Sequence, residues 1–477
     1  MSKNSLRQLD HVLAGACEVL VREIIGNPSV HVSEITHDST KVTQNSIFCC
    51  VVGESTDGHN FAAAAKQNGA VALLVERRVD VDITQVIVGD VRTAMGYVAS
   101  ELFDRPSQKL NVIGITGTNG KTTTAHLLAA ILHQHGWPTT VFGTLSGART
   151  TPESTDLQRS LATELAAGCK AVVMEVSSHA LTLRRVEGTK FRAAIFTNLG
   201  QDHLDFHKSV EDYFAAKARL FSATFTGTCI INRDDVHGAL LFDSLVDENL
   251  ESESFSVGDA REVSADISKI SFIWRGQKIE IDSGGHFNVM NALAAATAAA
   301  KLGVAVSDIA KGLAAASAVP GRFQSVTVGQ SFGVVVDYAH TPEALQNVLI
   351  AARELISSES RVIVVFGCGG DRDHLKRPKM GAVAKTFADV VYVTSDNPRH
   401  EDAQTIVDEI LEGVTRSPQI VVNLDRRQAI ADAFAVAQSG DVVVIAGKGH
   451  ETTQTIGSKE LPFSDVDVSR ELLQAAS

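Results

Sequence analysis

The stretch NVIGITGTNGKTTTAHLL carries the clearest chemical signal in the sequence. An apolar run leads into a turn that contains Gly117 and Gly120, and Lys121 and Thr122 then begin a helical pattern. Backbone N–H groups of such a turn bind phosphate together with the helix N-terminus, the lysine reaches the terminal phosphates, and the threonine hydroxyl faces Mg²⁺. Ile115 stands where the strict P-loop pattern requires glycine, so an ordinary glycine-rich strand–helix turn is the alternative interpretation.

Three further polar side chains could serve a metal ion. Glu175 lies near the end of the apolar run AVVMEV, where a carboxylate could bind Mg²⁺ directly or through water. His203 follows another apolar run, although a lone histidine there is more often structural. Lys217 shares a helical face with Tyr213, and such a lysine commonly extends its charged end to solvent. Burial would instead free its amine, which could take up CO₂ and become a metal-binding carbamate.

The loop Asp396-Asn397-Pro398-Arg399 follows the apolar run VVYVT. Pro398 fixes its own φ and pushes Asn397 towards an extended shape, which stiffens the loop. Arg399 can then present a planar fork to a carboxylate. The alternative is a solvated loop charge beside neighbouring acidic residues.

These residues follow apolar runs that alternate with helical patterns, which is typical of parallel sheets covered on both faces. The strands expected from Leu110 to about residue 320 are NVIGIT, AVVMEV, AAIFTN and TCIIN. After Pro320 the alternation restarts with VVVDY, RVIVVFG, VVYVTS and VVVIAG, which indicates a second doubly wound sheet with ligands at the carboxyl ends of its strands. We therefore expect an α/β protein with domains at 1–107, 108–320 and 321–477, the first ending in the linker DRPSQK.

Composition limits the function classes. A chain of 477 residues suggests about three domains. The net charge of −13 argues against nucleic acid or an anionic membrane as the main partner. No apolar stretch reaches the ~18–20 residues of a membrane span, and no signal peptide is evident. The six cysteines show no CxxC spacing, so we expect free thiols in a reducing cytoplasm.

Taken together and in order, nine motifs closely resemble those of the Mur ligases of peptidoglycan synthesis. The motifs are GTNGKTT, MEVSSHAL, TNLGQDHLDFH, YFAAKARLF, GHFNVMNALAA, VVDYAHTPEAL, VFGCGGDRD, SDNPR and AGKGHE. The likeness runs from about residue 36 to the C-terminus. It implies a small N-terminal α/β domain for the uridine nucleotide, a central P-loop-type ATPase with a parallel sheet, and a C-terminal Rossmann-like doubly wound domain.

The resemblance is greatest to the members that add the third residue of the stem peptide. It implies an ATP-dependent, ADP-forming amide ligase that adds meso-2,6-diaminopimelate to the D-glutamate γ-carboxylate of UDP-N-acetylmuramoyl-L-Ala-D-Glu through an acyl phosphate. The implied cofactors are ATP and Mg²⁺, the partners are the small-molecule substrates, and the protein is expected to be a cytoplasmic monomer that serves cell wall biogenesis, cell shape and division. The alternatives are an L-lysine-adding relative, a folylpolyglutamate-synthetase-like ligase and a nucleotide-dependent switch ATPase.

The matching positions imply a site for each substrate. For ATP they are Gly117, Thr118, Asn119, Gly120, Lys121, Thr122, Thr123, Asn291, Arg322 and Asp337. For the UDP-linked dipeptide they are His37, Ser39, Glu54, Ser55, Thr56, Thr150, Thr151, Ser177 and Arg185. For diaminopimelate they are Arg372, Asp396, Asn397, Pro398, Arg399, Gly447 and Glu451. For Mg²⁺ they are Thr122, Glu175, His203 and carbamylated Lys217, and the catalytic positions are Lys121, Lys217 and His203.

The loop containing Arg399 bears on the choice of amino acid. Relatives that add diaminopimelate carry the same Asp-Asn-Pro-Arg, whereas those that add lysine usually lack the arginine. Diaminopimelate has a second carboxylate at its far end and lysine has none, and an arginine facing the lysine ammonium would repel it. Glu451 is expected to pair with the distal ammonium of diaminopimelate.

Overall fold

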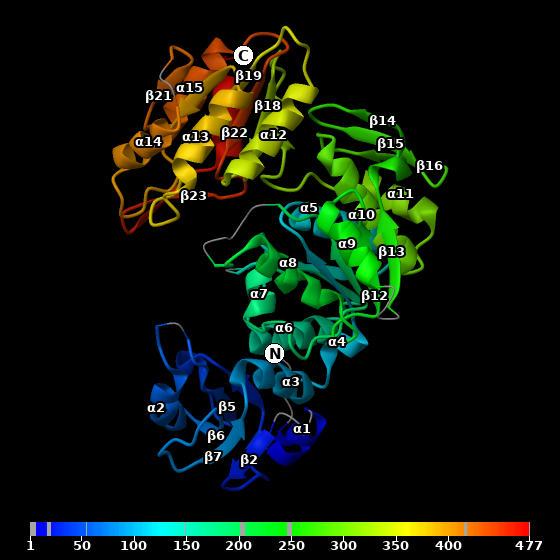
Figure 1. The fold of residues 1–477 in the computed structure, drawn as a ribbon, viewed down its shortest axis with the longest axis vertical. Helices are drawn as coiled ribbons and strands as arrows, with labels where there is room; N and C mark the ends of the chain where they lie inside the picture. The colour runs from blue at the N-terminus through cyan, green and yellow to red at the C-terminus, as the bar shows by residue number, and fades with distance from the viewer. Residues whose placement is uncertain are drawn as a thin grey trace. The chain divides into compact units, whose positions relative to one another are not determined.

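The computed structural model contains two compact units. The described residues are 6–16, 21–53, 55–147, 149–200, 206–245, 250–414 and 417–476. The first unit comprises residues 1–117, 136–197 and 209–254, and the second comprises residues 118–135, 198–208 and 255–477. Figure 1 draws both as a ribbon and labels many of their helices and strands.

The N-terminal part of the first unit is built on a five-stranded sheet in the order β2-β7-β6-β5-β4. β2 is antiparallel to β7 and the remaining pairs are parallel. Asp90 caps α3, whose buried face repeats every three or four residues and packs on the sheet. The elements of this part are β1 (Arg7–Gln8), α1 (Leu9–Gly15), β2 (Val21–Ile25), β3 (His31–Val32), β4 (Glu34–Thr36), η2 (Ser39–Lys41), β5 (Ser46–Cys49), η3 (Gly58–Phe61), α2 (Ala62–Gln67), β6 (Ala70–Val75), β7 (Thr84–Val88), α3 (Val91–Leu102) and α4 (Pro106–Lys109).

A six-stranded sheet in the order β13-β12-β11-β8-β10-β9 forms the rest of the first unit. The strands from β12 to β9 pair in parallel, and their side chains are buried on both faces in β8, β10, β11 and β12. The elements are β8 (Asn111–Thr116), β9 (Thr139–Phe142), α6 (Ser154–Ala166), β10 (Ala171–Glu175), α7 (Ser178–Thr182), β11 (Ala193–Phe196), α8 (Val210–Ala218), η4 (Arg219–Phe221), β12 (Thr228–Asn232), α9 (Val236–Leu245) and β13 (Glu251–Phe255).

The expected linker at residues 104–109 differs from the prediction. Pro106 and Ser107 are buried, and the helical turn α4 packs against α6. The Ser107 hydroxyl accepts a hydrogen bond from the Lys190 backbone N–H at 3.0 Å. The segment is therefore an integral part of the first unit.

The second unit begins with α5 and includes a small antiparallel sheet that the sequence analysis did not predict. α5 packs against α10 and α11, and α11 also contacts β16. The elements are α5 (Lys121–Gln134), η5 (Val257–Asp259), β14 (Arg261–Ala265), β15 (Ile270–Trp274), β16 (Gln277–Ile281), α10 (Phe287–Lys301) and α11 (Val306–Ala314). The three strands β14, β15 and β16 pair in order.

The C-terminal part of the second unit is the expected doubly wound sheet, in the order β17-β18-β22-β19-β20-β21. All pairs from β18 to β21 are parallel, and the short β17 is antiparallel to β18. The elements are β17 (Gln324–Ser325), β18 (Gly333–Asp337), α12 (Pro342–Glu354), β19 (Val362–Phe366), α13 (Lys376–Phe387), β20 (Val390–Val393), α14 (Ala403–Glu412), β21 (Ile420–Val422), α15 (Arg426–Val436), β22 (Val442–Ala446), β23 (Thr453–Ile456), β24 (Lys459–Pro462) and α16 (Asp465–Ala476).

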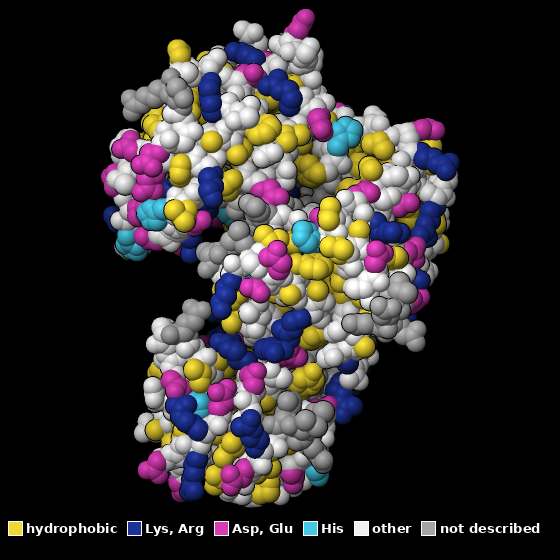
Figure 2. Space-filling view, in the orientation of Figure 1, with side chains coloured by type: hydrophobic (Ala, Val, Ile, Leu, Met, Phe, Trp, Pro, Cys, Tyr) yellow, Lys and Arg dark blue, Asp and Glu magenta, His cyan; other side chains and the backbone are white. Residues whose placement is uncertain are grey.

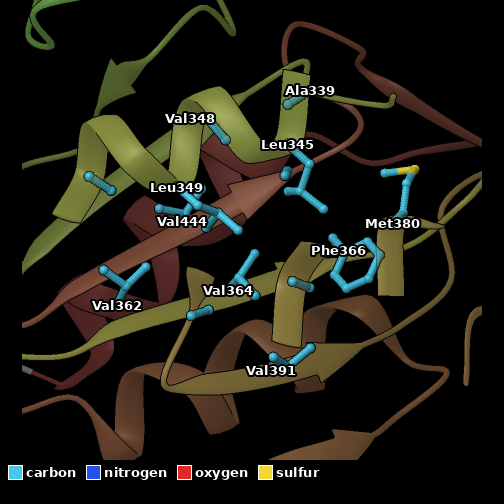
Figure 3. Close-up of a cluster of buried hydrophobic side chains, with 14 of the residues drawn as sticks. Ala339, Leu345, Val348, Leu349, Val362, Val364, Phe366, Met380, Val391 and Val444 are labelled. Carbon is cyan, nitrogen blue, oxygen red and sulfur yellow. The ribbon is translucent and has the colours of Figure 1, made fainter. Parts of the chain in front are cut away.

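Alternate residues of these strands supply two separate cores. One face carries Val362 and Val364 and is covered by α12, α13 and α14, as Figure 3 shows for Leu345 and Met380. The other face carries Ile363 and is covered by α15 and α16. The chain crosses the sheet from β18 through β19 and β20 to β21 and then returns to place β22 between β18 and β19. Ligands of such folds bind outside the carboxyl ends of the strands at this point.

A buried ion pair joins α15 to α16. Arg426 and Asp465 are fully buried, and two guanidinium nitrogens contact the carboxylate oxygens at 2.8 Å. The same guanidinium donates to the carbonyl oxygens of Ser395 (3.3 Å) and Ala446 (2.9 Å), which lie at the carboxyl ends of β20 and β22. This arginine therefore fixes the two strand ends from which the proposed amino-acid loops begin.

Replacing Arg426 with methionine is expected to lower the free energy of unfolding by about 3–5 kcal/mol, because the Asp465 carboxylate would be left buried without its partner. The double variant Arg426→Met/Asp465→Leu should recover most of this loss, since neither charge remains. Urea denaturation measures both, with Arg427→Met as the control, because the Arg427–Glu471 pair is exposed. An equal loss of unfolding free energy in Arg426→Met and Arg427→Met would contradict the prediction.

The described cysteines Cys49, Cys50, Cys169, Cys229 and Cys368 are buried thiols that form no disulfide with one another, as expected. Burial raises the pKa of the Cys50 and Cys368 thiols to about 12, so both stay protonated. Figure 2 shows acidic side chains gathered over α14, in keeping with the net charge. No helix in the described parts of the chain is both long and apolar enough to cross a membrane.

Candidate active site

The phosphate loop has the strand–turn–helix form that the sequence predicts. β8 ends at Thr116, Gly117 and Gly120 have positive φ, and α5 begins at Lys121. In the second unit, the Thr118 N–H donates to the Asn198 carbonyl and the Asn119 N–H donates to the Asn198 side chain, both at 2.9 Å. These bonds hold the loop from one side, and the N-terminus of α5 that follows is a type of site that binds anions.

Two side chains close to this helix N-terminus also match ATP positions. The Arg322 guanidinium donates to the Thr122 hydroxyl at 3.3 Å and lies 4.8 Å from the centre of the Tyr338 ring. Its Nε is buried and has no hydrogen-bond partner among the described residues. The Lys121 ammonium donates to the Thr118 carbonyl at 2.9 Å. A nucleotide phosphate would satisfy Arg322 and draw on Lys121, so the side chains present fit ATP.

Asp337 supports the loop that carries Arg322. Its two carboxylate oxygens accept the backbone N–H groups of Phe323 (2.7 Å) and Ala339 (2.8 Å). Burial raises the pKa of this carboxyl, although the charge of Arg322 acts in the opposite direction. The carboxylate therefore orients the arginine through the backbone.

Replacing Gly120 with alanine is expected to weaken ATP binding about 10-fold or more. A Cβ there would lie 2.3 Å from Asn291 Oδ1, and Asn291, one of the positions predicted to bind ATP, is held by Asn288 at 2.8 Å. Gly136→Ala is the matched control, because its φ of +82° is close to the +85° of Gly120 but nothing lies within 4 Å of the added atom. Both variants should lose ~1 kcal/mol of stability through backbone strain. Steady-state kinetics distinguish them, and equal KM values for ATP would refute the prediction.

In the first unit, Glu175 contacts several of the positions assigned to the UDP-linked dipeptide. Its buried carboxylate accepts the Thr144 N–H at 2.9 Å, and the Thr144 hydroxyl lies 3.2 Å from that of Thr150. The Thr151 hydroxyl donates to the Glu175 carbonyl at 2.9 Å and accepts the Ser177 N–H at 3.1 Å. The structure thus brings together Thr150, Thr151 and Ser177, which were assigned to the dipeptide substrate, and Glu175, which was assigned to Mg²⁺.

The sequence analysis predicted Arg185 as a substrate position but missed Glu153 and the other two arginines around it, Arg92 and Arg149. Arg185 Nε lies 2.9 Å from the buried Glu153 carboxylate, Arg149 forms a hydrogen bond to it, and Arg92 lies 3.7 Å away. Three cations therefore surround one carboxylate, which leaves a local positive charge for an anionic substrate. Glu153 directly follows Thr150-Thr151-Pro152, so the predicted positions Thr150 and Thr151 pointed to its location but not to its partners.

Lys217 is buried on the inner face of α8, so its amine does not extend to solvent as such a lysine commonly does. It is 1% exposed, its Nζ donates to the Gly117 carbonyl at 2.8 Å, and it lies 4.4 Å from the centre of the Tyr213 ring. The amine is therefore tied to the first residue of the phosphate loop. A carbamate nitrogen keeps one N–H, so this hydrogen bond is compatible with carbamylation.

The other described positions assigned to the UDP-linked dipeptide lie in the N-terminal part of the unit, after the carboxyl ends of β4 and β5. His37 follows β4, and its Nδ1 lies 3.3 Å from the Thr155 hydroxyl on α6. Burial lowers the pKa of His37 although Glu153 and Asp156 oppose it, so the ring favours its neutral form. Ser39 begins η2, whereas Ser55 and Thr56 are exposed in the loop after β5.

The positions assigned to diaminopimelate gather at the carboxyl ends of β19, β20 and β22. The Arg399 guanidinium donates to the Gly370 carbonyl at 2.7 Å, and its own φ is +52°. Arg372 is exposed in the same loop as Gly370. Gly447 has a φ of +113°, and a Cβ there would lie 2.5 Å from an Asp396 carboxylate oxygen. Only glycine allows the two loops to approach so closely.

Asn397 and Glu451 contact each other and share a third partner, Lys448, which the sequence analysis did not single out. The Lys448 ammonium donates to Asn397 Oδ1 at 3.0 Å and to Glu451 Oε2 at 2.9 Å, and the Asn397 amide donates to Glu451 at 2.7 Å. Burial raises the pKa of Asp396 against the nearby positive charges of Arg426 and Lys448. The motif AGKGHE indicated this location, but the role of its lysine depends on partners from two loops.

Two predicted positions, Glu54 and His203, lie outside the described residues. Within the described part of the chain, no three His, Cys, Asp or Glu side chains gather in a way that could hold a metal ion. Mg²⁺ commonly uses one or two carboxylates and completes its shell with substrate phosphates and water. The buried carboxylate of Glu175 and the hydroxyl of Thr122 are oxygen donors of the kind that Mg²⁺ prefers.

Three family models match successive parts of the chain. They are the Mur ligase family catalytic domain at residues 31–103, the Mur ligase middle domain at 115–299, and the Mur ligase glutamate ligase domain at 321–449. Among curated relatives, the UDP-N-acetylmuramoyl-L-alanyl-D-glutamate–2,6-diaminopimelate ligase of Aquifex aeolicus is 41% identical over 457 residues, covering 93% of this chain and 94% of the relative. The protein of the same name from Fusobacterium nucleatum is 40% identical over 452 residues, covering 91% and 93%.

Solved structures agree with these sequence matches. A structure of UDP-N-acetylmuramoyl-L-alanyl-D-glutamate–2,6-diaminopimelate ligase superimposes with a TM-score of 0.70 at 32% identity and covers 99% of both chains. MurF ligase from Thermotoga maritima, in complex with ADP, gives a TM-score of 0.62 at 20% identity and covers 93% of this chain and 97% of its own. The second likeness concerns the fold alone.

Proposed function

The chain belongs to the Mur ligase family, and from that premise we propose that it joins meso-2,6-diaminopimelate to the D-glutamate γ-carboxylate of UDP-N-acetylmuramoyl-L-Ala-D-Glu with hydrolysis of ATP to ADP and phosphate. The observation that carries the proposal is Arg399 in Asp-Asn-Pro-Arg, at the carboxyl end of β20. Its neighbours there include Asn397 and, through Lys448, Glu451. An arginine and a carboxylate in one loop cluster suit an amino acid whose far end carries both a carboxylate and an ammonium.

We further propose the domain limits 1–107, 108–320 and 321–477, which enclose one matched family model each. The first would hold the uridine nucleotide, the second ATP and the third diaminopimelate. A cytoplasmic monomer suits an enzyme whose substrates are all small and soluble.

The first chemical step activates a poor electrophile. An oxygen of the D-glutamate γ-carboxylate attacks the γ-phosphorus of ATP, the bond to the β-phosphate oxygen breaks, and an acyl phosphate and ADP result. Two anions must approach each other, so positive groups have to offset their repulsion. Lys121 and the α5 N-terminus would hold the phosphates, and Arg322, with its buried Nε, would bind the transferred group.

The second step forms the amide. The amine of diaminopimelate, having released its proton, attacks the acyl carbon, and the tetrahedral intermediate expels phosphate. Bound Mg²⁺ would supply charge neutralisation for the phosphate groups, and Thr122, Glu175, His203 and carbamylated Lys217 are the residues proposed to hold it. Arg185 would hold the dipeptide portion in place, since its guanidinium is fixed by Glu153.

The direct test is a coupled assay with purified protein, ATP, Mg²⁺, UDP-N-acetylmuramoyl-L-Ala-D-Glu and one amino acid at a time, with product mass and phosphate release measured. Phosphate release that requires both the nucleotide and meso-diaminopimelate, together with the tripeptide mass, would support the proposal. Phosphate release that ignores both substrates would overturn the ligase assignment. Equal use of L-lysine and diaminopimelate would overturn the amino-acid assignment.

A further inference from the structure

Lys448 is a buried cation whose donors are all in use. Its side chain is 0% exposed, and Nζ donates to Asn397 Oδ1 (3.0 Å), Glu451 Oε2 (2.9 Å) and the Thr453 carbonyl (2.7 Å). An ammonium has three N–H groups, so no donor remains for a substrate. Lysine is almost never fully buried without such partners. Any effect of Lys448 on the reaction must therefore pass through the groups it contacts.

The first of these groups is the Asn397 side-chain amide. Its Oδ1 accepts from Lys448 and also from the Thr455 backbone N–H at 2.9 Å, while its Nδ2 donates to Glu451 Oε2 at 2.7 Å. Because two donors face the oxygen, the amide has only one orientation that satisfies them. One N–H of Asn397 remains for a ligand.

The second group is the Glu451 carboxylate, whose two oxygens have different surroundings. Oε2 accepts from both Lys448 and Asn397. Oε1 has no hydrogen-bond donor from the residues that the structure describes, and the side chain is 30% exposed. One oxygen is thus used to fix the carboxylate, and the other is left for a cationic ligand.

We propose that Lys448 is a positioning residue for the amino-acid substrate, which holds Glu451 as an oriented carboxylate so that Oε1 accepts the distal ammonium of diaminopimelate. This inference rests on the proposed function and adds to it a group that touches no substrate. This role explains why the cationic Lys448 side chain lies close to a site that would bind the ammonium group of the substrate. Its charge is cancelled by Glu451 Oε2, and no donor of Lys448 is left facing the ligand.

The electrostatics agree with this geometry. Burial alone would raise the pKa of Glu451, but the hydrogen bond and charge of Lys448, with help from Asn397, outweigh it and lower the pKa. The other ionisable groups that act on this cluster are Asp396, Asp465, Arg426, His450 and Tyr338. Without Lys448, burial would dominate, so Glu451 would take up a proton as the pH falls.

The test compares Lys448→Met with the wild-type enzyme in the complete assay, with Lys459→Met on the exposed strand β24 as the control. We expect the KM for diaminopimelate to rise about 10- to 100-fold in Lys448→Met, because one partner of a buried charge pair is removed. The KM values for ATP and for the nucleotide-peptide should stay unchanged, and kcat should be largely retained. In Lys448→Met, the KM for diaminopimelate should also increase more steeply than in the wild-type enzyme as the pH is lowered. A purely structural role of Lys448 would not produce this difference.

A second pair of variants keeps the inference falsifiable if Lys448→Met folds poorly. On a Glu451→Gln background, Lys448→Met removes the remaining buried charge and is expected to raise the KM no further. An independent, multiplicative effect of Lys448→Met on that background would overturn the inference. A KM for diaminopimelate and a pH profile in Lys448→Met that equal those of the wild-type enzyme would also overturn the inference, and would leave the proposed function intact. A wild-type enzyme that does not use diaminopimelate would instead refute the proposed function itself.

Discussion

Lys217→Ala is expected to lower kcat by about 10³-fold or more, with partial recovery when bicarbonate, formate or acetate is added. The expected loss corresponds to several kcal/mol of metal-assisted charge stabilisation, at ~1.36 kcal/mol for each factor of ten. Lys217 is buried and donates to the Gly117 carbonyl, so a carbamate there would lie beside the start of the phosphate loop. A small carboxylate could enter the space left by alanine and replace the missing anion.

The alternative is that Lys217 acts as a cation, as its position over the Tyr213 ring would also allow. Lys217→Arg would then keep activity, and carboxylates would not restore Lys217→Ala. Lys170→Ala serves as the control, since Lys170 is exposed in the same unit. Wild-type activity in Lys217→Ala would remove the carbamate from the mechanism, and rescue by chloride at the same concentration would show that the effect is not specific to carboxylates.

Arg399→Ala is expected to reduce kcat/KM for meso-diaminopimelate by about 10³-fold, because the distal carboxylate would lose its charged partner in a partly buried site. Arg399→Lys should lose most of the same activity, since an ammonium cannot reproduce the planar fork. The loss should be much smaller for L-lysine, which has no distal carboxylate. Steady-state kinetics with both amino acids measure the ratio.

The matched control for this prediction is Arg470→Ala on α16, whose guanidinium pairs with Asp467 at the surface. It should leave both amino acids unaffected. An Arg399→Ala variant that loses activity equally with both would show that the arginine supports the loop, through its bond to Gly370, rather than selecting the substrate.

The strands and helices of the parallel sheets were predictable because their signals are local. The runs NVIGIT and VVVIA became β8 and β22, and Gly120-Lys121 marked the start of α5. The sheet β14-β15-β16 was missed because its strands are only partly apolar, as in β14, where several side chains face solvent. Period-two alternation in β15 and the Arg275-Gly276 turn were the available signals.

The side chains assigned to the substrates were predictable through motifs, whereas their supports were not. Lys448, Glu153 and Arg426 owe their importance to partners that are distant in sequence or on other loops, and no local pattern specifies such pairings. Arg426 did carry a signal. It lies on the helical face of Ala429, Ile430 and Ala433, all buried, while the adjacent arginine lies off that face.

The Arg426–Asp465 pair also has a consequence for protein synthesis. The ends of β20 and β22 are held by a guanidinium whose only carboxylate partner in the described structure comes from α16. A nascent chain would leave this arginine without that partner until residue 465 had emerged from the ribosome. The amino-acid pocket should therefore be among the last parts to mature during translation, and a premature stop codon before α16 should yield a protein that retains its phosphate loop but not an ordered binding site for the incoming amino acid.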